Sequence, residues 1–223
     1  HVSPSTTNNE PPTTDSAPQV QSRRSRGAIP ASDRAHSKQQ SGRVLPEWVA
    51  ASTEDAEDIP WFSAQDPRAE EAREYLPALL DAGSLTATLR NLSDGSFAVE
   101  LLEEGWSACS RSSFIERFAE AAAISRLWSR KVVLQGGGED WVIAHTLIPE
   151  ASLSGAIGEV LSLGSKPLGE WLFSQAALQR SEIELCRIDS STWGRRSWFT
   201  LQGQDLLVVE FFLPALLSRA SAK

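Results

Sequence analysis

Residues 206–215 read LLVVEFFLPA, and this stretch decides how the chain is expected to fold. Seven of the eight positions from Leu206 to Leu213 are apolar, and the eighth is Glu210. Alternation along a strand places Glu210 on a face with apolar neighbours, and the opposite face is apolar as well. Strands that are apolar on both faces are typical of the interior of a sheet. The stretch therefore predicts a buried strand that carries one carboxylate.

A carboxylate in such a strand needs an explanation, because its charge is costly to bury. Glu210 can pair with a cation, take up a proton in the dry interior, or serve a ligand. A structural salt bridge and a functional role both stay open on this stretch alone.

The neighbouring segments predict an α+β fold, a single domain with about six strands in a largely antiparallel sheet. The expected strands are 96–108, 126–135, 141–149, 178–189, 195–201 and 206–214, and most of them are joined by short turns. Asp66-Pro67 is typical of a helix start, with an N-cap acceptor before a proline at the first helical position. Further short helices are expected at 77–83, 85–92, 113–123 and within 154–176.

Residues 1–45 differ in composition from the rest of the chain and predict a disordered tail. They hold six Lys/Arg, three Asp/Glu and five Pro, and they have few large apolar residues with which to offset the entropy of folding. Removing these charges from the totals of 21 basic and 29 acidic residues leaves 15 and 26, a net charge of −11 for residues 46–223. The folded domain is expected to occupy residues 46–223.

Bulk composition narrows the class of protein. The 223 residues carry a net charge of −8, which argues against nucleic acid as a main partner. Cys109 and Cys186 are too few for a disulfide framework, so we expect a reduced, cytoplasmic protein. No apolar run reaches the length of about 18 residues that a membrane span needs, and the N-terminus lacks a signal-peptide core. A monomer is the starting expectation.

Three of the expected strands each place one polar group on an apolar face. Arg130 falls between Trp128 and Val132, and His145 shares its face with Trp141, Ile143 and Leu147. Glu210 is the third group. One interpretation is structural: an internal Arg130–Glu210 ion pair, with His145 hydrogen-bonded in the core. The other is a closed pocket with a cation at one end and a carboxylate at the other, which suits a small anionic ligand with a hydroxyl.

Several chemistries lack their motifs. QGGGED at 135–140 joins two strands and does not lead into a helix, so it is no phosphate loop. Three His and two Cys residues without close spacing predict no metal site, and no G-x-S-x-G nucleophile elbow is present. A further basic point, Arg195-Arg196, stands just before a strand, where a solvated turn is an equally good interpretation.

The run LWSRKVVLQGGGEDWVIAHTLIP at 127–149, followed by LGSKPLGEWLF and TWGRRSWFTLQGQDLLVVEFFLPA, resembles the chorismate pyruvate-lyase family. The resemblance covers residues 70–215 and is strongest from Trp128 onward. It rests on the joint order of R-x-V-x-L, P-L-G-x-x-L-F, W-G-R-R-S and E-x-F-L-P. It implies a six-stranded antiparallel sheet, an enclosed site under helical flaps, and no cofactor. The implied reaction removes pyruvate from chorismate to give 4-hydroxybenzoate, the ring precursor of ubiquinone, in a bacterial cytoplasm.

The resemblance also implies site residues. Arg130 would bind the ring carboxylate, the backbone of Leu168 would contribute at the same end, and Glu210 would meet the 4-hydroxyl. Leu85 falls where the family has an apolar flap residue. His145 stands where an active-site arginine is expected, so the second carboxylate would meet a group whose charge depends on pH. Arg195 is an alternative for that contact.

Two rivals to an active lyase stay open. The first is a non-catalytic domain that senses aromatic carboxylates, because ligand-binding domains of some transcription regulators resemble this fold. Such a regulator needs a DNA-reading helix-turn-helix, and the polar, proline-rich residues 1–65 contain none. The second is a lyase-like protein whose activity is weakened by His145.

Overall fold

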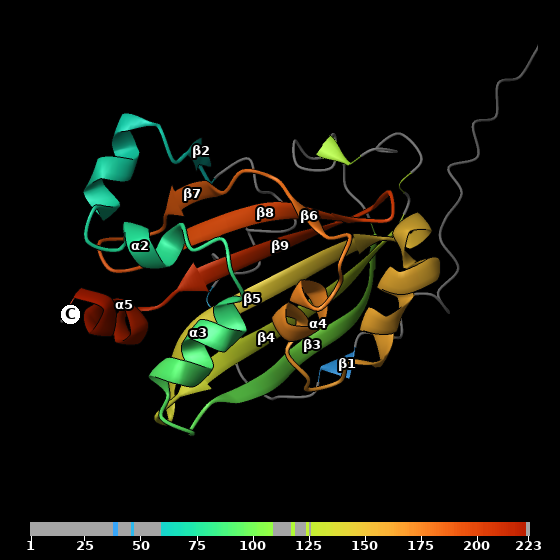
Figure 1. Cartoon of the computed structure of the whole chain (residues 1–223), viewed down its shortest axis with the longest axis horizontal. Helices are drawn as coiled ribbons and strands as arrows, with labels where there is room; N and C mark the ends of the chain where they lie inside the picture. The colour runs from blue at the N-terminus through green and yellow to red at the C-terminus, as the bar shows by residue number, and fades with distance from the viewer. Residues whose placement is uncertain are drawn as a thin grey trace, which may run out of the picture. The chain divides into compact units, whose positions relative to one another are not determined.

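The computed structural model describes residues 38–39, 46, 59–108, 117–118, 124 and 126–221. One antiparallel sheet has the strand order β1-β3-β4-β5-β9-β8-β7-β2, with β6 paired to β8 (Figure 1). In this part of the chain the longer strands are β3 (Ala98–Ala108), β4 (Arg126–Gly136), β5 (Glu139–Pro149), β7 (Glu184–Arg187), β8 (Trp193–Leu201) and β9 (Gln204–Phe212). The two-residue strands are β1 (Lys38–Gln39), β2 (Phe62–Ser63) and β6 (Gln179–Arg180). The α+β fold with about six substantial strands is therefore confirmed.

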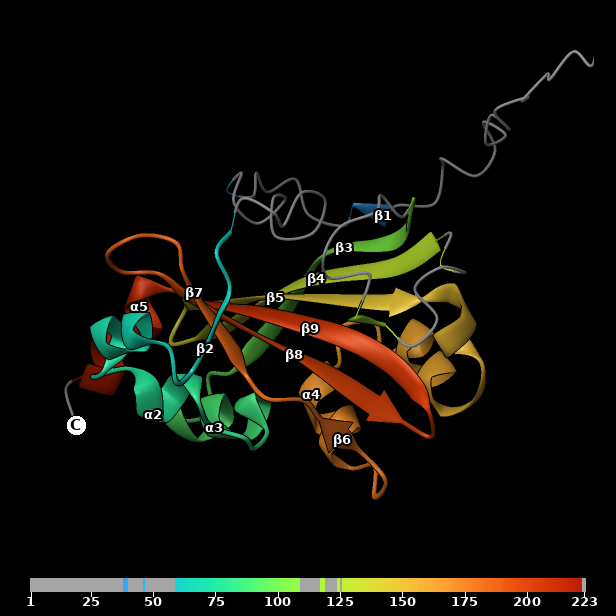
Figure 2. The same ribbon diagram turned by 90° about the horizontal axis from the view of Figure 1, so that it is seen from above.

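Short helices cover one face of this sheet. They are η2 (Pro67–Ala72), α2 (Leu76–Leu79), α3 (Leu85–Leu92), η5 (Glu150–Leu153), η6 (Gly155–Ser162), α4 (Leu168–Phe173) and α5 (Pro214–Ser221). Figures 1 and 2 show α3 and α4 lying over the strands on the same side of the sheet. We call this side, which carries Val132, Ala144 and Phe212, the front face, and the side with Val133, Ile143 and Val209 the back face.

Hydrophobic burial holds the helices on the front face. Leu85 and Leu89 of α3 are buried in one cluster with Val132 and Leu134 of β4. Burying each side chain of this size stabilises the fold by about 1.5–3 kcal/mol, an upper bound for this count. Ser84 begins α3, because its hydroxyl accepts a hydrogen bond from the backbone N–H of Ala87 at 3.4 Å. The helix is therefore fixed at its start by a cap and along its length by apolar packing.

The predicted elements match with local differences. The Asp66 side chain caps a helix as expected, but η2 is a 3-10 helix that ends at Ala72. The expected strand 178–189 is split into β6 and β7. At the break, the backbone N–H of Ser181 donates to the Trp198 carbonyl at 2.8 Å, whereas the Ser181 hydroxyl, and not its carbonyl, accepts from the backbone N–H of Trp198 at 3.0 Å. The expected helix at 113–123 lies almost wholly outside the described residues. Two residues of the predicted tail, Lys38–Gln39, form β1, and the rest of residues 1–45 lies outside the described part.

The solvated-turn interpretation of Arg195-Arg196 is wrong, because both residues lie in β8 between β7 and β9. Arg195 is 1% exposed and Arg196 is 8% exposed. Alternation predicted that Trp141 and Ile143 share a face, but they lie on opposite faces of the sheet. The pairing of β4 with β5 shifts between Leu134 and Gln135, so Trp141 is the extra residue of a bulge and packs in the front cluster.

Candidate active site

A pocket lies between the front face of the sheet and helices α3 and α4. The strands contribute residues from β4, β5, β6, β8 and β9, and the helices contribute the opposite wall. The lining residues are Leu85, Thr86, Arg130, Val132, Leu134, Ala144, Thr146, Leu168, Gly169, Leu172, Phe173, Arg180, Arg195, Phe199, Val208 and Glu210. Four of the five site residues predicted from the sequence, Arg130, Glu210, Leu85 and Leu168, are therefore brought to one pocket.

Strand register explains why Arg130 and Glu210 meet the same space. Arg130 pairs with Thr146 across β4 and β5, and Glu210 pairs with Ala144 across β5 and β9. Paired residues of antiparallel strands share a face, and so do residues two apart on one strand. Thr146 and Ala144 are two apart on β5, so all four residues project to the front. The two charged groups come from strands separated by one other strand, which leaves a gap between them.

Arg130 is anchored on backbone carbonyls. It is 1% exposed, and its Nη2 donates to the carbonyl oxygens of Gly164 at 2.7 Å and Lys166 at 3.0 Å. Burial lowers the pKa of Arg130 from its ordinary value, and the charge of Glu104 on β3 opposes that shift. The Nε of Arg130 is buried without a hydrogen-bond partner among the described residues. A ligand carboxylate would satisfy this donor and offset the cost of the buried charge.

Glu210 forms an ion pair with Arg195, not with Arg130. The Nε of Arg195 donates to Oε2 of Glu210 at 2.6 Å, and the two side chains are 1% and 14% exposed. The Nη1 of Arg195 donates to the carbonyl oxygens of Leu79 at 3.1 Å and Asp81 at 2.9 Å. The internal Arg130–Glu210 pair of the structural interpretation is therefore wrong. Glu210 is positioned by a neighbour on β8 and keeps its Oε1 without a hydrogen bond from any described residue.

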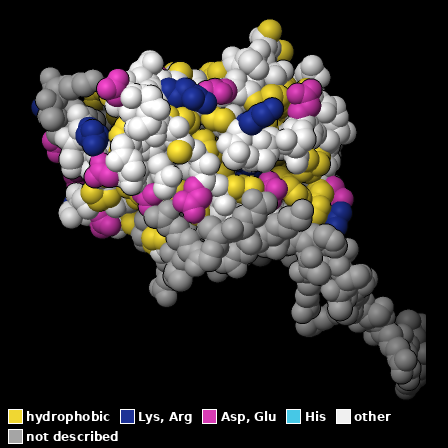
Figure 3. Space-filling view, turned by 90° about the horizontal axis from the view of Figure 1, so that it is seen from below, with side chains coloured by type: hydrophobic (Ala, Val, Ile, Leu, Met, Phe, Trp, Pro, Cys, Tyr) yellow, Lys and Arg dark blue, Asp and Glu magenta, His cyan; other side chains and the backbone are white. Residues whose placement is uncertain are grey.

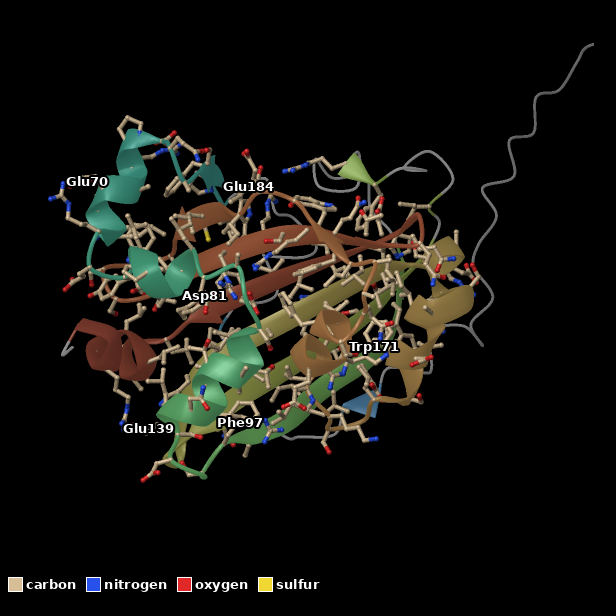
Figure 4. All side chains as sticks on the ribbon, viewed as in Figure 1. Glu70, Asp81, Phe97, Glu139, Trp171 and Glu184 are labelled. Carbon is tan, nitrogen blue, oxygen red and sulfur yellow. The ribbon has the colours of Figure 1, made fainter. Side chains whose placement is uncertain are left out.

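Sequence reasoning missed Arg180, a third arginine that lines the pocket. Its Nε donates to the Ser197 hydroxyl at 3.0 Å, and its Nη1 donates to the Asp81 carbonyl at 3.3 Å. Asp81 lies in the connection between α2 and α3 (Figure 4). Burial is the main cause that lowers the pKa of Arg180 to about 10, followed by the positive charge of Arg195. No residue spacing pointed to Arg180, because an arginine in a polar segment is usually solvent-exposed.

The two helices that roof the pocket approach each other closely. A Cβ on Gly169 of α4 would lie 2.8 Å from Oγ1 of Thr86 on α3, closer than real Cβ contacts. At the surface, Nε of Arg90 on α3 donates to Oε1 of Glu170 on α4 at 2.5 Å. Leu85 and Leu168 begin these helices and face the pocket. A tight backbone contact and a surface ion pair therefore hold the roof together.

His145, expected near the second carboxylate, lies on the back face and does not line the pocket. It pairs with Lys131 and Val209, one residue out of step with the front-facing Thr146. Its Nε2 lies 2.7 Å from the Ser129 hydroxyl, and it is 1% exposed, so the expected hydrogen bond in the core is confirmed. Burial, and then the charge of Lys131, lower the pKa of His145 well below 6.5, which keeps the ring neutral.

The pocket is positively charged although the chain is acidic. Its lining contains three arginines and one glutamate, a formal charge of +2, whereas the whole chain carries −8. Figure 3 shows basic and acidic side chains scattered over the lower side of the molecule instead of gathered in one patch. Within the described ranges, no cluster of His, Cys, Asp or Glu could hold a metal ion. In the same ranges, no helix is long and apolar enough to cross a membrane.

Comparisons with solved structures found weak likenesses. One is a GntR-family transcriptional regulator from Bacillus cereus, which is 11% identical with a TM-score of 0.37 and covers 54% of this chain and 93% of that chain. Another is a possible transcriptional regulator, YydK, from Bacillus subtilis, at 11% identity and a TM-score of 0.40, covering 56% of this chain and 60% of that chain. TM-scores this low carry no argument about function.

Comparisons of sequence are much stronger. A probable chorismate pyruvate-lyase of Pseudomonas aeruginosa strain PAO1 is 35% identical over 167 residues, which is 69% of this chain and 93% of that protein. The chorismate pyruvate-lyase of Salmonella newport is 44% identical over 91 residues, covering 41% of this chain and 54% of that protein. The family model described as "Chorismate lyase" matches residues 56–222. The chain therefore belongs to the chorismate lyase family.

Proposed function

We propose that the pocket binds chorismate and eliminates pyruvate from it, leaving 4-hydroxybenzoate, without a cofactor. The observation that carries this proposal is the separation of Arg130 and Glu210 within one pocket, each oriented by other groups and not by each other. An aromatic product with a carboxylate at one end and a hydroxyl at the other suits two such groups. The formal charge of +2 on the lining also matches the two carboxylates of the substrate.

The reaction requires no covalent bond between the protein and the substrate. The C4 proton leaves, the C3–O bond breaks, and its electron pair departs with the enolpyruvate oxygen. The methylene carbon of the enolpyruvate then takes up a proton, which gives pyruvate. Aromatisation of the ring supplies the driving force. The protein has to bind one conformer, exclude water and handle a proton. The apolar lining from Val132, Leu134 and Val208 provides the dry surroundings.

The proposed residue roles follow from the contacts. Arg130 binds the ring carboxylate through the donors that Gly164 and Lys166 do not use. Glu210, which is held by Arg195, accepts a hydrogen bond from the 4-hydroxyl through Oε1 and assists proton transfer. Leu85 and Leu168 close the pocket over the ring from α3 and α4. Ubiquinone biosynthesis as the pathway, a cytoplasmic location and a monomeric state stay predictions from the sequence.

Mixing the purified protein with chorismate tests the proposal, with 4-hydroxybenzoate followed by chromatography and pyruvate by a coupled dehydrogenase. We expect both products in equal amounts. Arg130→Ala should abolish detectable binding of 4-hydroxybenzoate, because a ligand charge left uncompensated in the interior costs about 3–5 kcal/mol. Glu210→Gln should lower kcat by about 10²–10⁴-fold and change affinity much less. Binding of 4-hydroxybenzoate without turnover of chorismate would favour the sensing domain instead.

Lys131→Ala is the matched control for Arg130→Ala. Lys131 is the next residue of β4, is mostly buried and pairs with Glu103 at 3.4 Å, but it projects to the back face. Loss of a cation there should leave product affinity unchanged. Unchanged affinity in Arg130→Ala as well would remove Arg130 from the site.

A further inference from the structure

The pocket contains one more cation than the binding of the ring carboxylate uses. Of its three arginines, Arg195 is paired with Glu210, and its Nη1 is occupied by two backbone carbonyls. Arg130 and Arg180 have no carboxylate within ion-pair distance among the described residues. Arg130 has its proposed role at the ring carboxylate. Arg180 is therefore the cation without a carboxylate in direct contact, and the charges of Glu210 and Asp81 act on it only from a distance.

Arg180 stands on the opposite side of the pocket from Arg130. Its Nε contacts Ser197, which lies at the far end of the paired row Arg130–Thr146–Val208–Ser197. Neighbouring strands lie about 4.8 Å apart, so three strand spacings place Ser197 about 14 Å from Arg130 along the sheet. Arg130 and Arg180 therefore approach the pocket from opposite ends of this row. From these positions they can bind the two carboxylates of one dianion.

The contacts of Arg180 leave it free to bind an anion. It has a 3.0 Å bond to a neutral hydroxyl and a long 3.3 Å bond to a carbonyl that Arg195 also uses. The guanidinium carbon of Arg180 lies 5.1 Å from the centre of the Phe199 ring, and this contact helps to fix the direction of the side chain. With a pKa lowered to about 10 by burial and by Arg195, the group is still charged at neutral pH. A carboxylate here would offset the cost of burying that charge.

We propose that Arg180 forms a second anion subsite, which binds the carboxylate of the enolpyruvyl side chain and so holds the group that leaves as pyruvate. This inference rests on the proposed function and adds a specificity-determining residue to it. When the C3–O bond breaks, its electron pair moves onto the enolpyruvate oxygen. Arg180 stabilises the leaving group as this charge develops, which is where a fixed cation contributes most.

The other candidates for this contact fit less well. Arg195 is neutralised by Glu210 at 2.6 Å, so moving it onto the substrate would release the carboxylate that meets the 4-hydroxyl. His145 is neutral and lies on the back face of β5. Arg180 alone among these three residues combines an unpaired charge with a place in the pocket wall.

The test separates the dianionic substrate from the monoanionic product. In Arg180→Gln, kcat/KM for chorismate should fall by about 10²–10³-fold, the usual effect of removing one such donor. The dissociation constant of 4-hydroxybenzoate, measured by titration calorimetry, should change less than about threefold, because that ligand uses Arg130. Arg180→Lys, which keeps the charge but loses the planar fork, should lie between the wild type and Arg180→Gln in kcat/KM.

Arg196→Gln is the matched control. Arg196 is a buried arginine on β8 that projects to the back face and pairs with Glu184 at 2.6 Å. It should lower stability and leave kcat/KM within about threefold of the wild type. If Arg180→Gln does not fold, Arg180→Met keeps the packing on Phe199 and is judged by the same criteria.

Two results would overturn the inference while leaving the proposed function intact. One is an unchanged kcat/KM in Arg180→Gln when the wild type turns chorismate over. The other is an equal loss of chorismate turnover and product affinity, which would make Arg180 a structural residue of the whole pocket. A wild type that produces no pyruvate refutes the proposed function itself, and the second subsite with it.

Discussion

The approach of α3 to α4 over the pocket depends on the missing side chain of Gly169, and Gly169→Ala tests this. A Cβ at this position would lie 2.8 Å from Oγ1 of Thr86, whereas ordinary van der Waals contact begins at 3.4 Å, so the helices have to separate by about 0.6 Å. Thr86 cannot easily rotate away, because a β-branched side chain is restricted in χ1. The φ of Gly169 is not positive, so alanine fits the backbone there.

The expected effect on stability is small, and the effect on binding is larger. Alanine in a helix is favoured over glycine by about 1 kcal/mol, and overpacking costs about 1–3 kcal/mol, so these two terms largely offset each other. Leu85 and Leu168 line the pocket from the same two helices and move with them. We expect the dissociation constant of 4-hydroxybenzoate to rise about tenfold, which corresponds to about 1.4 kcal/mol.

A double-mutant cycle with Thr86→Ala decides whether the clash is the cause. Removing Oγ1 leaves the Thr86 Cβ at 3.6 Å from the methyl carbon that alanine adds, which is an ordinary contact. The double variant should therefore bind 4-hydroxybenzoate as well as Thr86→Ala alone, with a coupling energy of about 1.4 kcal/mol. Titration calorimetry gives the affinities, and thermal unfolding checks stability. Additive effects of the two substitutions, or unchanged product affinity in Gly169→Ala, would refute the reasoning.

Two further predictions concern groups away from the reacting atoms. Arg90→Glu and Glu170→Arg should each weaken 4-hydroxybenzoate binding by about twofold, because the pair joins α3 to α4 at the surface. The combined charge reversal should restore the affinity. The effect should vanish in high salt, and a change in affinity that does not depend on salt would contradict this prediction. His145 is held neutral in the folded protein, whereas the unfolded chain takes up its proton near pH 6.5, so stability should fall below that pH by up to about 1.4 kcal/mol per pH unit. Urea unfolding between pH 7.5 and 5.5 should show that the free energy of unfolding depends less on pH in His145→Gln than in the wild type. Equal pH dependence in the wild type and the variant would exclude His145 as the cause.

Strand alternation predicted the site up to the point where register was needed. It identified Arg130 and Glu210 as polar groups on apolar faces, and both line the pocket. The same rule could not say which face of β5 meets the front of the sheet, because a shift of one residue exchanges the faces. The pairing of Ala144 with Glu210 brings Thr146 to the front and sends His145 to the back. An arginine at position 145 would face the same way by this register.

Arg180 shows a different limit of sequence reasoning. Its hydrogen-bond partners Ser197 and Asp81 are 17 and 99 residues away, so no local spacing links them. The segment around it was expected to be one continuous strand, and the break at Ser181 turns Arg180 into the end of a two-residue strand instead. The strand pattern gave Arg180 no place at the pocket, where it is half-buried. Long-range pairing, and not propensity, decides the place of such a residue.

The distribution of charge reconciles the acidity of the whole chain with the proposed binding of a dianion. At physiological ionic strength the influence of solvent-exposed charges is largely screened beyond about 8 Å, so the exposed groups behind the net charge of −8 act weakly on the pocket. There the three arginines act over short distances in apolar surroundings, where electrostatic interactions are strongest. Glu210 neutralises Arg195, and the remaining two cations lie on opposite sides, so their mutual repulsion is small without the ligand. Binding a molecule with two separated carboxylates then removes two desolvation costs at once, whereas the product carboxylate removes one. In the proposed arrangement with two anion subsites, this difference favours the substrate over the product.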